Sequence, residues 1–379
     1  YPTNKIRFYV NKENVINSGI INSSETDKIV DYIDIDLPKS GLYKNQILML
    51  DILSKNDWKR PIYFTGGSYK DSEYIWMKDF LQLDGLVYKL VPIETPVNKE
   101  NPYQMGRIEP DRMYDIIKKW EWGNSESPNI YHDPETRKNS ISFRGNLHRL
   151  ANEFIESGEF EKANEIMDLS FEKMPIDFFE YYSLSEPYIL SYYKIGEDKK
   201  AQYLYKTIEA KYLDQIKYYS ISMREFEDMF DLGEFAENIF TYTERYRGLI
   251  ENQIKLGNYD FVKPSIKSFV NYTEIFKGIY GEYDYYMFLI SFIEPLYISN
   301  ENNLARKLYK DISDQIVSRL ETIISAKDES NSTYLSNLFD EEIESAKSLI
   351  DIISLYEKED YLIKESNELE DFTSEFLIK

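Results

Sequence analysis

The feature that most restricts the fold is an ordered set of large, small and turn-forming residues that begins near residue 147. Large apolar residues from Leu147 to Phe154 lie three or four positions apart, so they form a stripe on one face of a helix. Gly158 stands where two helices need a tight turn, and Ala163 is small enough to let the second helix approach the first. Pro175 then ends the second helix. The pattern predicts an antiparallel pair of helices.

The same order of residues returns further along the chain. Tyr188, Gly196 and Ala201 repeat it, and Ala201 follows Ala163 by 38 residues. Weaker copies are centred on Leu249, Ile250, Gly257 and Ile266, and on Phe292, Ile293, Leu296, Ala305, Tyr309 and Ile312. Self-similarity at roughly 30 to 50 residues is typical of helical-hairpin arrays such as tetratricopeptide repeats (TPRs). We therefore predict a TPR-like α-helical hairpin array over residues 141–379, closed by polar helices near residues 337–356 and 361–376.

Residues 1–95 show shorter and mixed patterns. Residues 32–37 alternate apolar and acidic side chains, which is typical of a half-buried strand. The other predicted elements are a buried helix at 44–55, a strand at 60–65 that ends at Gly66-Gly67, a helix near 73–82 and a strand at 85–91. This order favours a small three-layer α/β unit with a parallel sheet.

The fold class predicted from these patterns is α+β, mainly α, with three segments. Residues 1–95 form the α/β unit, residues 96–140 form a connector, and residues 141–379 form the helical array. The connector is rich in Pro, Asn and Gly and contains one short helix at 110–120.

Composition narrows the classes of function. The formal net charge of −22 disfavours binding to phosphate backbones and to an anionic membrane face, so no nucleic-acid partner is expected. Cysteine is absent, which excludes disulfides and thiolate metal sites. The longest apolar runs, such as residues 47–53 and 286–293, are shorter than the roughly 20 residues that cross a bilayer. A start at Tyr1 without a signal pattern is typical of an excised or processed chain.

Residues suited to catalysis are scarce. Of the two histidines, His148 lies inside the first helical pair and is predicted to be a solvent-side helical residue. His132 opens the run His132-Asp133-Pro134-Glu135, which is either a weak metal site or, more commonly, a turn rich in Asp and Pro. Acidic pairs such as Asp34 with Asp36 are too numerous to single out an acid/base pair. We expect no catalytic residue, no metal site and no cofactor in this chain.

Tyrosine is unusually frequent, with 34 residues. Tyrosine joins an apolar ring to a polar hydroxyl, so it can stack on sugars or peptides, or pack between helices. Packing is the commoner role, and the residues considered for binding on a concave face of the array are Tyr181, Tyr192, Tyr218 and Tyr285.

Four short segments carry a more specific signal. They are NDWKRPIYF at residues 56–64, FLQLDGLVYKLVP at 80–92, MYD at 113–115 and WEWGN at 120–124. Together they closely resemble the region that follows the membrane spans in a bacterial integral membrane family common in Bacteroidetes. That family is similar to protein O-mannosyltransferases and is classed as glycosyltransferase family 117, among GT-C type enzymes that use polyprenyl-phosphate sugars. Its members continue into TPR-like repeats, as residues 147–175 do here.

The resemblance implies a non-catalytic accessory domain on the periplasmic or extracytoplasmic side of a membrane, with the catalytic helices upstream of this chain. The implied partners are an acceptor protein or peptide and the upstream transmembrane region of the same protein, with a glycan as a further possibility. By the resemblance, Trp58, Arg60, Pro61 and Tyr63 fix the packing of the juxtamembrane unit or its docking to the membrane part. A free-standing helical-repeat scaffold or glycan-binding surface protein stays open as the alternative.

Overall fold

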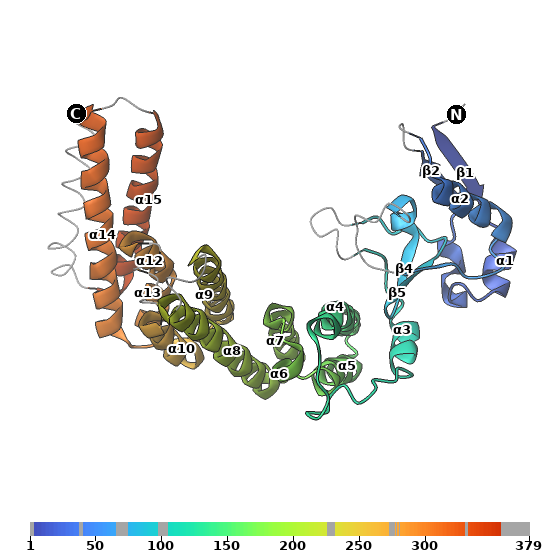
Figure 1. The fold of residues 1–379 in the computed structure, drawn as a ribbon, viewed down its shortest axis with the longest axis horizontal. Coiled ribbons are helices and arrows are strands. Elements are labelled where there is room, and N and C mark those ends of the chain that lie inside the picture. The colour runs from blue at the N-terminus through green and yellow to red at the C-terminus, as the bar shows by residue number, and fades with distance from the viewer. Residues whose placement is uncertain are drawn as a thin grey trace. The chain divides into compact units, whose positions relative to one another are not determined.

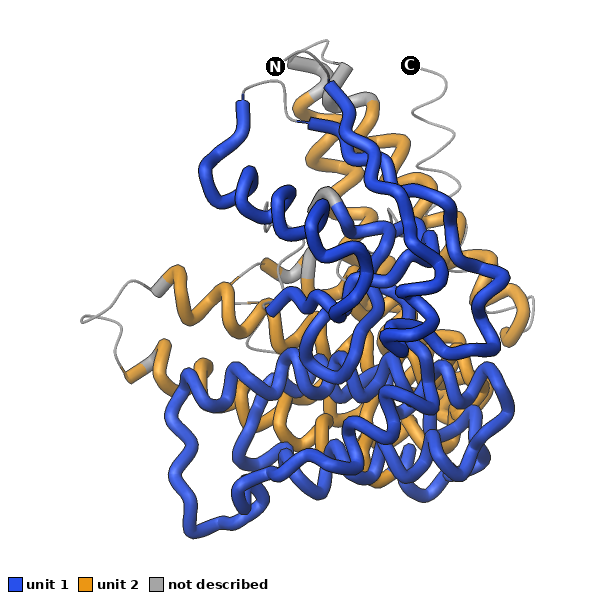
Figure 2. The backbone as a smooth tube through the Cα atoms, turned by 90° about the vertical axis from the view of Figure 1, so that its right-hand side faces the viewer, with its two compact units in different colours: residues 1–202 blue, residues 203–379 orange. Residues whose placement is uncertain are grey.

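The computed structural model describes residues 4–37, 41–65, 75–97, 105–225, 232–272, 277, 279, 281–329 and 333–357. The chain divides into two compact units, residues 1–202 and 203–379 (Figure 2). In the first unit, short strands gather with three helices, and the first helical hairpins follow (Figure 1). In the second unit, the described residues form helices alone. The predicted class, α+β and mainly α, is confirmed, while the predicted boundaries at residues 95 and 140 stay a prediction.

The first sheet has two antiparallel strands, β1 (Lys5–Tyr9) and β2 (Tyr32–Asp36). Between them lie a short helix, α1 (Lys12–Asn17), and a 3-10 helix, η1 (Ser23–Lys28). The predicted alternation in β2 is confirmed, because Ile33 and Ile35 are buried while Asp34 is half-buried and Asp36 exposed. Strand β1 was not among the predicted elements.

The second sheet is antiparallel throughout, with strand order β3-β5-β4. Its strands are β3 (Tyr63–Phe64), β4 (Leu81–Asp84) and β5 (Val87–Leu90). The parallel sheet predicted for this region is wrong: β4 and β5 are joined by the two residues Gly85 and Leu86, and so tight a connection forms only an antiparallel hairpin.

The helix predicted near residues 73–82 is also wrong over its described part. Residues 75–80 form a short 3-10 helix, η2 (Ile75–Phe80), and the chain then enters β4. All four residues of β4 are buried, so protein covers both faces of this strand although it lies at the edge of the sheet. Residues 73 and 74 and the predicted turn at Gly66-Gly67 lie outside the described residues.

Helix α2 (Lys44–Asn56) forms where it was predicted, but most of it is not buried. Gln46 and Leu50 face the protein, four residues apart on one side of the helix. Ile47, Leu48 and Ile52 expose 53%, 55% and 59% of their surface. The expectation of a buried helix is therefore wrong, because only one narrow side of α2 packs.

The connector contains α3 (Pro110–Ile117), the predicted short helix, which begins with a proline in its first turn. It is followed by α4 (Pro134–Ser157), α5 (Phe160–Lys173), α6 (Ile176–Phe179) and α7 (Glu186–Lys194), with a 3-10 turn, η3 (Tyr182–Leu184), before α7. Helix α4 is tied to the strand region by two side chains. Asn146 Nδ2 donates to Gly85 O at 2.8 Å, and Arg149 donates to Gly106 O at 2.7 Å.

The remaining described helices are α8 (Asp198–Glu225), α9 (Leu232–Lys255), α10 (Tyr259–Tyr272), α12 (Glu282–Leu289), η4 (Ile290–Phe292), α13 (Ile293–Ile298), α14 (Asn302–Glu329) and α15 (Thr333–Tyr356). The helix predicted near residues 337–356 is confirmed by α15. The last predicted helix, near 361–376, lies outside the described residues.

Four helix-to-helix turns share one backbone design. The turn residues Gly158, Gly196, Gly257 and Asn300 all have positive φ, between 61° and 79°. In each turn the N–H of the following residue donates to the carbonyl five positions earlier, with N···O distances of 2.8 to 3.0 Å. This is the hydrogen bond of a Schellman motif, which caps the end of the first helix. The predicted hairpin turns are confirmed at Gly158, Gly196 and Gly257, and the structure adds Asn300, which was not predicted as a turn residue.

The small and large residues of the repeat also lie where the pattern predicted. Phe154 and Ala163 are fully buried on the two helices of the first hairpin. In the later turns, Ala201, Val262 and Ala305 take the position of Ala163, five residues after the turn residue, and each is fully buried. A small or branched side chain at this position lets the two helices approach closely.

Candidate functional site

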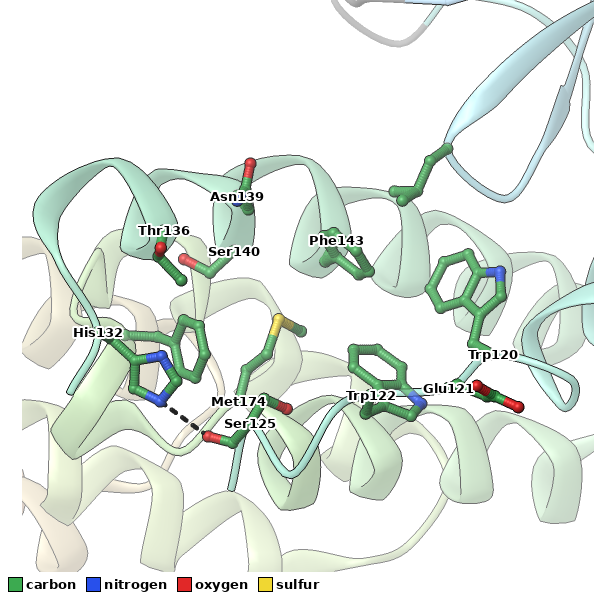
Figure 3. Close-up of a pocket in the computed structure, with 12 residues that line it drawn as sticks. Trp120, Glu121, Trp122, Ser125, His132, Thr136, Asn139, Ser140, Phe143 and Met174 are labelled. Carbon is green, nitrogen blue, oxygen red and sulfur yellow. Dashed lines mark hydrogen bonds between the residues drawn. The ribbon is translucent and has the colours of Figure 1, made fainter. Parts of the chain in front are cut away.

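A groove lined by aromatic residues lies between the connector and α4 (Figure 3). Its volume is about 420 Å³, within the usual range of small-ligand sites. We call it the aromatic groove, and its lining residues are Leu86, Trp120, Glu121, Trp122, Ser125, His132, Thr136, Asn139, Ser140, Phe143, Met174 and Phe179.

One wall of the aromatic groove is a face of α4. Thr136, Ser140 and Phe143 lie four and three positions apart, so they point to the same side of the helix. The start of α4 is fixed by Asp133, whose Oδ1 accepts hydrogen bonds from the backbone N–H groups of Glu135 and Thr136 at 2.9 and 3.0 Å. The wall is therefore part of a capped, regular helix.

Three aromatic rings are packed together at one end of the groove. Trp120 lies 5.4 Å from Trp122 and 5.2 Å from Phe143, measured between ring centroids, and Trp122 lies 5.4 Å from Phe143. The β4–β5 turn covers this end, and a Cβ added to Gly85 would come within 2.8 Å of Trp120 Cζ2. Since Asn146 holds the same turn through Gly85 O, the position of the Trp120 indole is set by two elements.

His132 forms the other end of the groove. Its Nε2 lies 3.0 Å from Ser125 O, and its ring centroid lies 4.6 Å from that of Phe179. Arg137 Nε donates to His132 O at 2.8 Å, which holds the backbone of the same residue. His132 is thus a buried, packed side chain.

The hydroxyl groups in the lining are already bonded to the protein. Ser140 Oγ donates to Arg137 O at 2.7 Å, and Ser125 Oγ donates to Lys173 O at 2.6 Å. Thr136 Oγ1 donates to Asp133 Oδ2 at 2.8 Å. The surface left for a ligand is mainly ring carbons, methyl groups and the thioether of Met174. Glu121 is the only charged residue in the lining, and it is exposed.

A second, more polar hollow of about 540 Å³ adjoins the same two tryptophans. Its lining includes Lys118, Glu165, Glu172 and Lys173 from α5 and the connector. These charges pair with one another: Lys118 with Glu165, and Lys173 with Glu172 at 2.8 Å. Trp120 and Trp122 therefore line both an apolar hollow and a polar hollow whose charges are paired.

The predicted packing or docking motif divides into buried and exposed members. Trp58 exposes only 9% of its surface, and its Nε1 donates to Tyr9 O at 3.3 Å. Arg60 and Pro61 are exposed, and Tyr63 exposes 42%. Trp58 thus packs the N-terminal region, while the other three are open to solvent.

The backbone at the start of this motif is held in an uncommon conformation. Asp57 and Trp58 both have positive φ, 45° and 60°. Asn14 holds the segment from α1: its Nδ2 donates to Asp57 O at 2.8 Å and to Asp57 Oδ2 at 2.9 Å. These two bonds hold Asp57 in this conformation.

The four tyrosines considered for binding lie in different environments. Tyr192 and Tyr285 each expose 3% and donate their hydroxyls to Asp168 Oδ1 and Val270 O, both at 2.9 Å. Their side chains belong to the core and present no accessible ring. Tyr181 is half-buried, and Tyr218 exposes 60%.

The prediction that His148 is a solvent-side residue is wrong. Its Nε2 lies 3.0 Å from Ser191 Oγ of α7, and its ring lies 4.8 Å from the ring of Tyr188. Burial lowers the pKa of His148 to about 4, so the ring is neutral at pH 7. Packing between α4 and α7 accounts for this residue. For His132, the Asp-Pro turn interpretation agrees with Asp133 capping α4.

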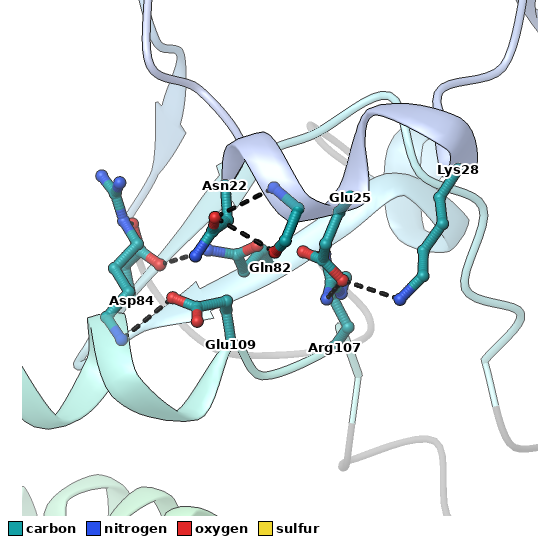
Figure 4. A network of polar contacts seen from close by, with 9 residues as sticks. Asn22, Glu25, Lys28, Gln82, Asp84, Arg107 and Glu109 are labelled. Carbon is teal, nitrogen blue, oxygen red and sulfur yellow. Dashed lines mark hydrogen bonds and ion pairs between the residues drawn. The ribbon is translucent and has the colours of Figure 1, made fainter. Parts of the chain in front are cut away.

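A network of buried charges joins the strand region to the loop before α3 (Figure 4). Asp84 is buried and accepts from Gln82 Nε2 at 2.8 Å and from Arg112 Nε at 3.1 Å, and the ammonium of fully buried Lys89 lies 3.3 Å away. Glu25 accepts from Arg107 at 2.8 Å. Each of these carboxylates faces a cation, which is the arrangement of a structural ion-pair network.

The described residues hold neither a candidate metal centre nor a candidate membrane span. Among them, no group of three or more His, Cys, Asp or Glu side chains could hold a metal ion. None of their helices combines the length and apolar composition that crossing a bilayer requires.

Comparison with known proteins bears on the N-terminal region. Residues 1–112 match a family model described as TMEM260-associated domain 2. That domain is associated with a membrane protein family, so the predicted association with a membrane protein is confirmed at this level. No curated protein and no solved structure matches the chain. The match covers both sheets and ends within α3, ahead of the tryptophans of the aromatic groove.

The aromatic groove was not predicted as a site. The segment WEWGN at 120–124 could have indicated it, but this segment was interpreted only as part of the family resemblance. Two tryptophans separated by one residue in a connector rich in Pro and Gly place large apolar rings where no helix or strand explains them. Such residues are typical of a tertiary contact or a binding surface.

Proposed function

We propose that this chain is a non-catalytic, extracytoplasmic accessory domain of a membrane glycosyltransferase, and that it binds the acceptor protein. The observation that carries the proposal is the match of residues 1–112 to a domain associated with a membrane protein family. The helical hairpins that follow are elements of the kind that other repeat proteins use to bind partners.

The chemistry of the candidate site supports a binding role. Glycosyl transfer or hydrolysis by side chains draws on pairs of carboxylates set a few ångströms apart. The aromatic groove offers one carboxylate, Glu121, and the buried carboxylates Asp84 and Glu25 are neutralised by cations. An apolar groove next to a helical hairpin suits the capture of a polypeptide better than bond cleavage.

The first test is the coding sequence upstream of Tyr1. The proposal expects about ten apolar segments, each of the roughly 20 residues that span a bilayer. An upstream reading frame without such segments would contradict the proposal that this chain belongs to a membrane enzyme.

The second test uses the full membrane protein. Removing the second compact unit, residues 203–379, should lower glycosylation of acceptor proteins while turnover of the sugar donor is retained in part. A matched control carries Tyr203→Ser, which alters one exposed side chain of that unit. Normal glycosylation of every acceptor by the truncated protein would refute an acceptor-binding role for the unit.

The alternative is a free-standing helical scaffold or glycan-binding surface protein, and it depends on accessible tyrosines. Tyr218 exposes 60% and lies 5.1 Å from the ring of Tyr219, so this pair is the place to test it. A glycan array with the intact chain and with Tyr218→Ser separates the two proposals. If no oligosaccharide on the array binds the chain, the alternative is refuted.

A further inference from the structure

We propose that the aromatic groove binds an extended polypeptide segment that carries two apolar side chains, at least one of them aromatic, next to a basic residue. This inference deepens the proposed function and rests on it, because it names the part of an acceptor that the domain would hold. It is carried by the apolar lining, the length of the groove, the charge at its mouth and its rigid frame.

The lining selects an apolar occupant. The hydroxyls of Ser125, Thr136 and Ser140 are committed to the protein's own acceptors, as is the ring of His132 to Ser125 O. A sugar would bring several hydroxyl groups, and the lining leaves them few partners: the Asn139 amide, the Glu121 carboxylate and the two indole N–H groups. The remaining hydroxyls would lose water without a replacement, an unfavourable exchange. An aromatic or aliphatic side chain loses only water that solvates apolar surface.

The length of the groove fits a short stretch of extended chain. From Thr136 to Phe143 the wall spans seven residues of helix, about 10 Å at a rise of ~1.5 Å per residue. An extended peptide advances ~3.3 Å per residue, so about three residues lie along it, and alternate side chains point to one face. Aromatic rings lie at both ends: Phe179 packs beside His132, and Trp120 packs beside Phe143 (Figure 3). Two alternate side chains of the peptide therefore each meet a ring.

The charge of Glu121 favours a particular residue type next to the apolar residues of the bound peptide. Glu121 is the only charged member of the lining, it is exposed, and its carboxylate forms no ion pair with another described residue. The lining contains no cation to receive a phosphate or a fatty-acid carboxylate. Since the chain as a whole carries a net charge of −22, a basic residue beside the groove gains both from Glu121 and from the overall field.

The groove is held open by contacts within the protein. The β4–β5 turn presses against Trp120 at Gly85, and Asn146 fixes that turn to α4 at 2.8 Å. Trp122 and Phe143 support the same indole. A frame that is already ordered loses little conformational freedom on binding, which favours affinity.

The experiment measures fluorescence anisotropy of labelled peptides with the intact chain. The probe is a short Gly/Ser peptide with Phe, Leu two positions later, and then Lys-Lys. Two matched peptides replace Lys-Lys by Glu-Glu, or replace Phe and Leu by Ser, and methyl mannoside is added as a competitor. We expect saturable binding of the first peptide in the micromolar range, at least tenfold weaker binding of the Ser peptide, and no competition by the sugar.

Three variants connect binding to the groove. Trp122→Ala should weaken the Phe-Leu-Lys-Lys peptide about tenfold or more, and Leu86→Ser, at the exposed rim, should weaken it severalfold. Glu121→Gln should cut the preference for Lys-Lys over Glu-Glu by about two- to fivefold, the usual worth of one exposed charge pair. The control is Tyr131→Ser, which changes a side chain that is 80% exposed and outside the groove. Thermal unfolding of each variant shows whether the fold is kept.

The outcomes are distinct. If no peptide binds up to millimolar concentration, if the Ser peptide binds as well as the Phe-Leu peptide, or if methyl mannoside displaces the probe, the assignment of this occupant is overturned. If Leu86→Ser and Glu121→Gln keep the fold and bind all peptides unchanged, the site is elsewhere. If the peptide binds as expected but the membrane protein carrying Leu86→Ser and Glu121→Gln modifies every acceptor normally, the proposed function fails while the groove assignment stands.

Discussion

Asn300 ends its helix in the same left-handed backbone conformation as Gly158, with φ of +61° and +78° respectively. After each of them, the next N–H reaches back five residues with the same hydrogen bond, Glu301 to Leu296 O and Glu159 to Phe154 O, both at 2.8 Å. Asparagine is the residue other than glycine that most readily adopts this conformation. The fourth hairpin thus keeps the turn of the first without keeping its glycine.

This turn leads to a prediction about backbone strain. A Cβ at Gly158 would meet nothing within 4 Å, so Gly158→Ala tests the backbone conformation alone. We expect it to lower the free energy of unfolding by about 1–2 kcal/mol, because L-residues are disfavoured at positive φ. Urea unfolding followed by circular dichroism measures the effect.

Gly145, in the interior of α4, is the matched control for that substitution. A methyl group at this position would also meet open space, but here the backbone is helical. Gly145→Ala should raise the free energy of unfolding by about 0.5–1 kcal/mol. Equal effects of the two substitutions would contradict the role assigned to the turn.

A second prediction concerns acid. Burial lowers the pKa of His148 to about 4 from an ordinary value near 6.5, so the unfolded chain binds more protons than the folded chain between these values. Stability should therefore rise with pH from about 4 to 6.5, and be lost as the pH falls through that window, by at most about 3 kcal/mol.

Urea unfolding at several pH values checks the contribution of His148. In His148→Gln, the part of the slope between pH 4 and 6.5 that this ring causes should disappear, since glutamine does not titrate. A slope identical to that of the unsubstituted chain would mean that other groups cause the acid sensitivity.

A third prediction tests how the aromatic groove is built. Gly85→Ala would place a methyl group 2.8 Å from Trp120 Cζ2 at a residue with φ of +75°. We expect a loss of about 2–4 kcal/mol from the combined backbone and packing costs, and a shift in tryptophan fluorescence as the indole moves. Gly123→Ala is the control, because it has φ of +60° but open space, and it should cost only about 1–2 kcal/mol without moving Trp120.

A fourth prediction concerns the buried pair of Asp84 and Lys89. Both side chains are almost fully buried and lie 3.3 Å apart. Asp84→Asn leaves the ammonium of Lys89 without its counter-charge and should cost about 3–5 kcal/mol, whereas the double variant Asp84→Asn/Lys89→Met should recover much of that loss. Chemical denaturation of Asp84→Asn, of Lys89→Met and of the double variant gives the coupling energy between the two side chains. A double variant that is less stable than Asp84→Asn alone would contradict this assignment.

The parts of the fold that local rules determine could be predicted from the sequence. The hairpin of α4 and α5 depends on a stripe from Leu147 to Phe154, a turn at Gly158 and a small residue at Ala163, all within one short segment. The sheets could not be predicted in the same way. The order of strands along the chain does not indicate which strands pair in a sheet. The two-residue β4–β5 connection was missed because β4 was interpreted as the end of a helix.

The exposure of α2 and the aromatic groove were beyond local patterns for a different reason. Apolar residues at positions 47, 48, 50, 52 and 53 surround most of the helix, so they do not indicate which side packs. The groove joins Leu86, Trp120, His132 and Met174, which are far apart in the sequence. Only the packing of α4 on the β4–β5 turn brings them together.

The bonds from Asn146 and Arg149 to the carbonyls of Gly85 and Gly106 have a mechanical consequence. They fix α4 directly to the strand region, so the helix is held by more than its connection through the chain. Any segment held in the groove would keep one fixed angle to the β-hairpin, which lies within the region that matches TMEM260-associated domain 2. Lengthening the loop between Trp122 and His132 would therefore leave the position of the bound segment relative to the β-hairpin unchanged.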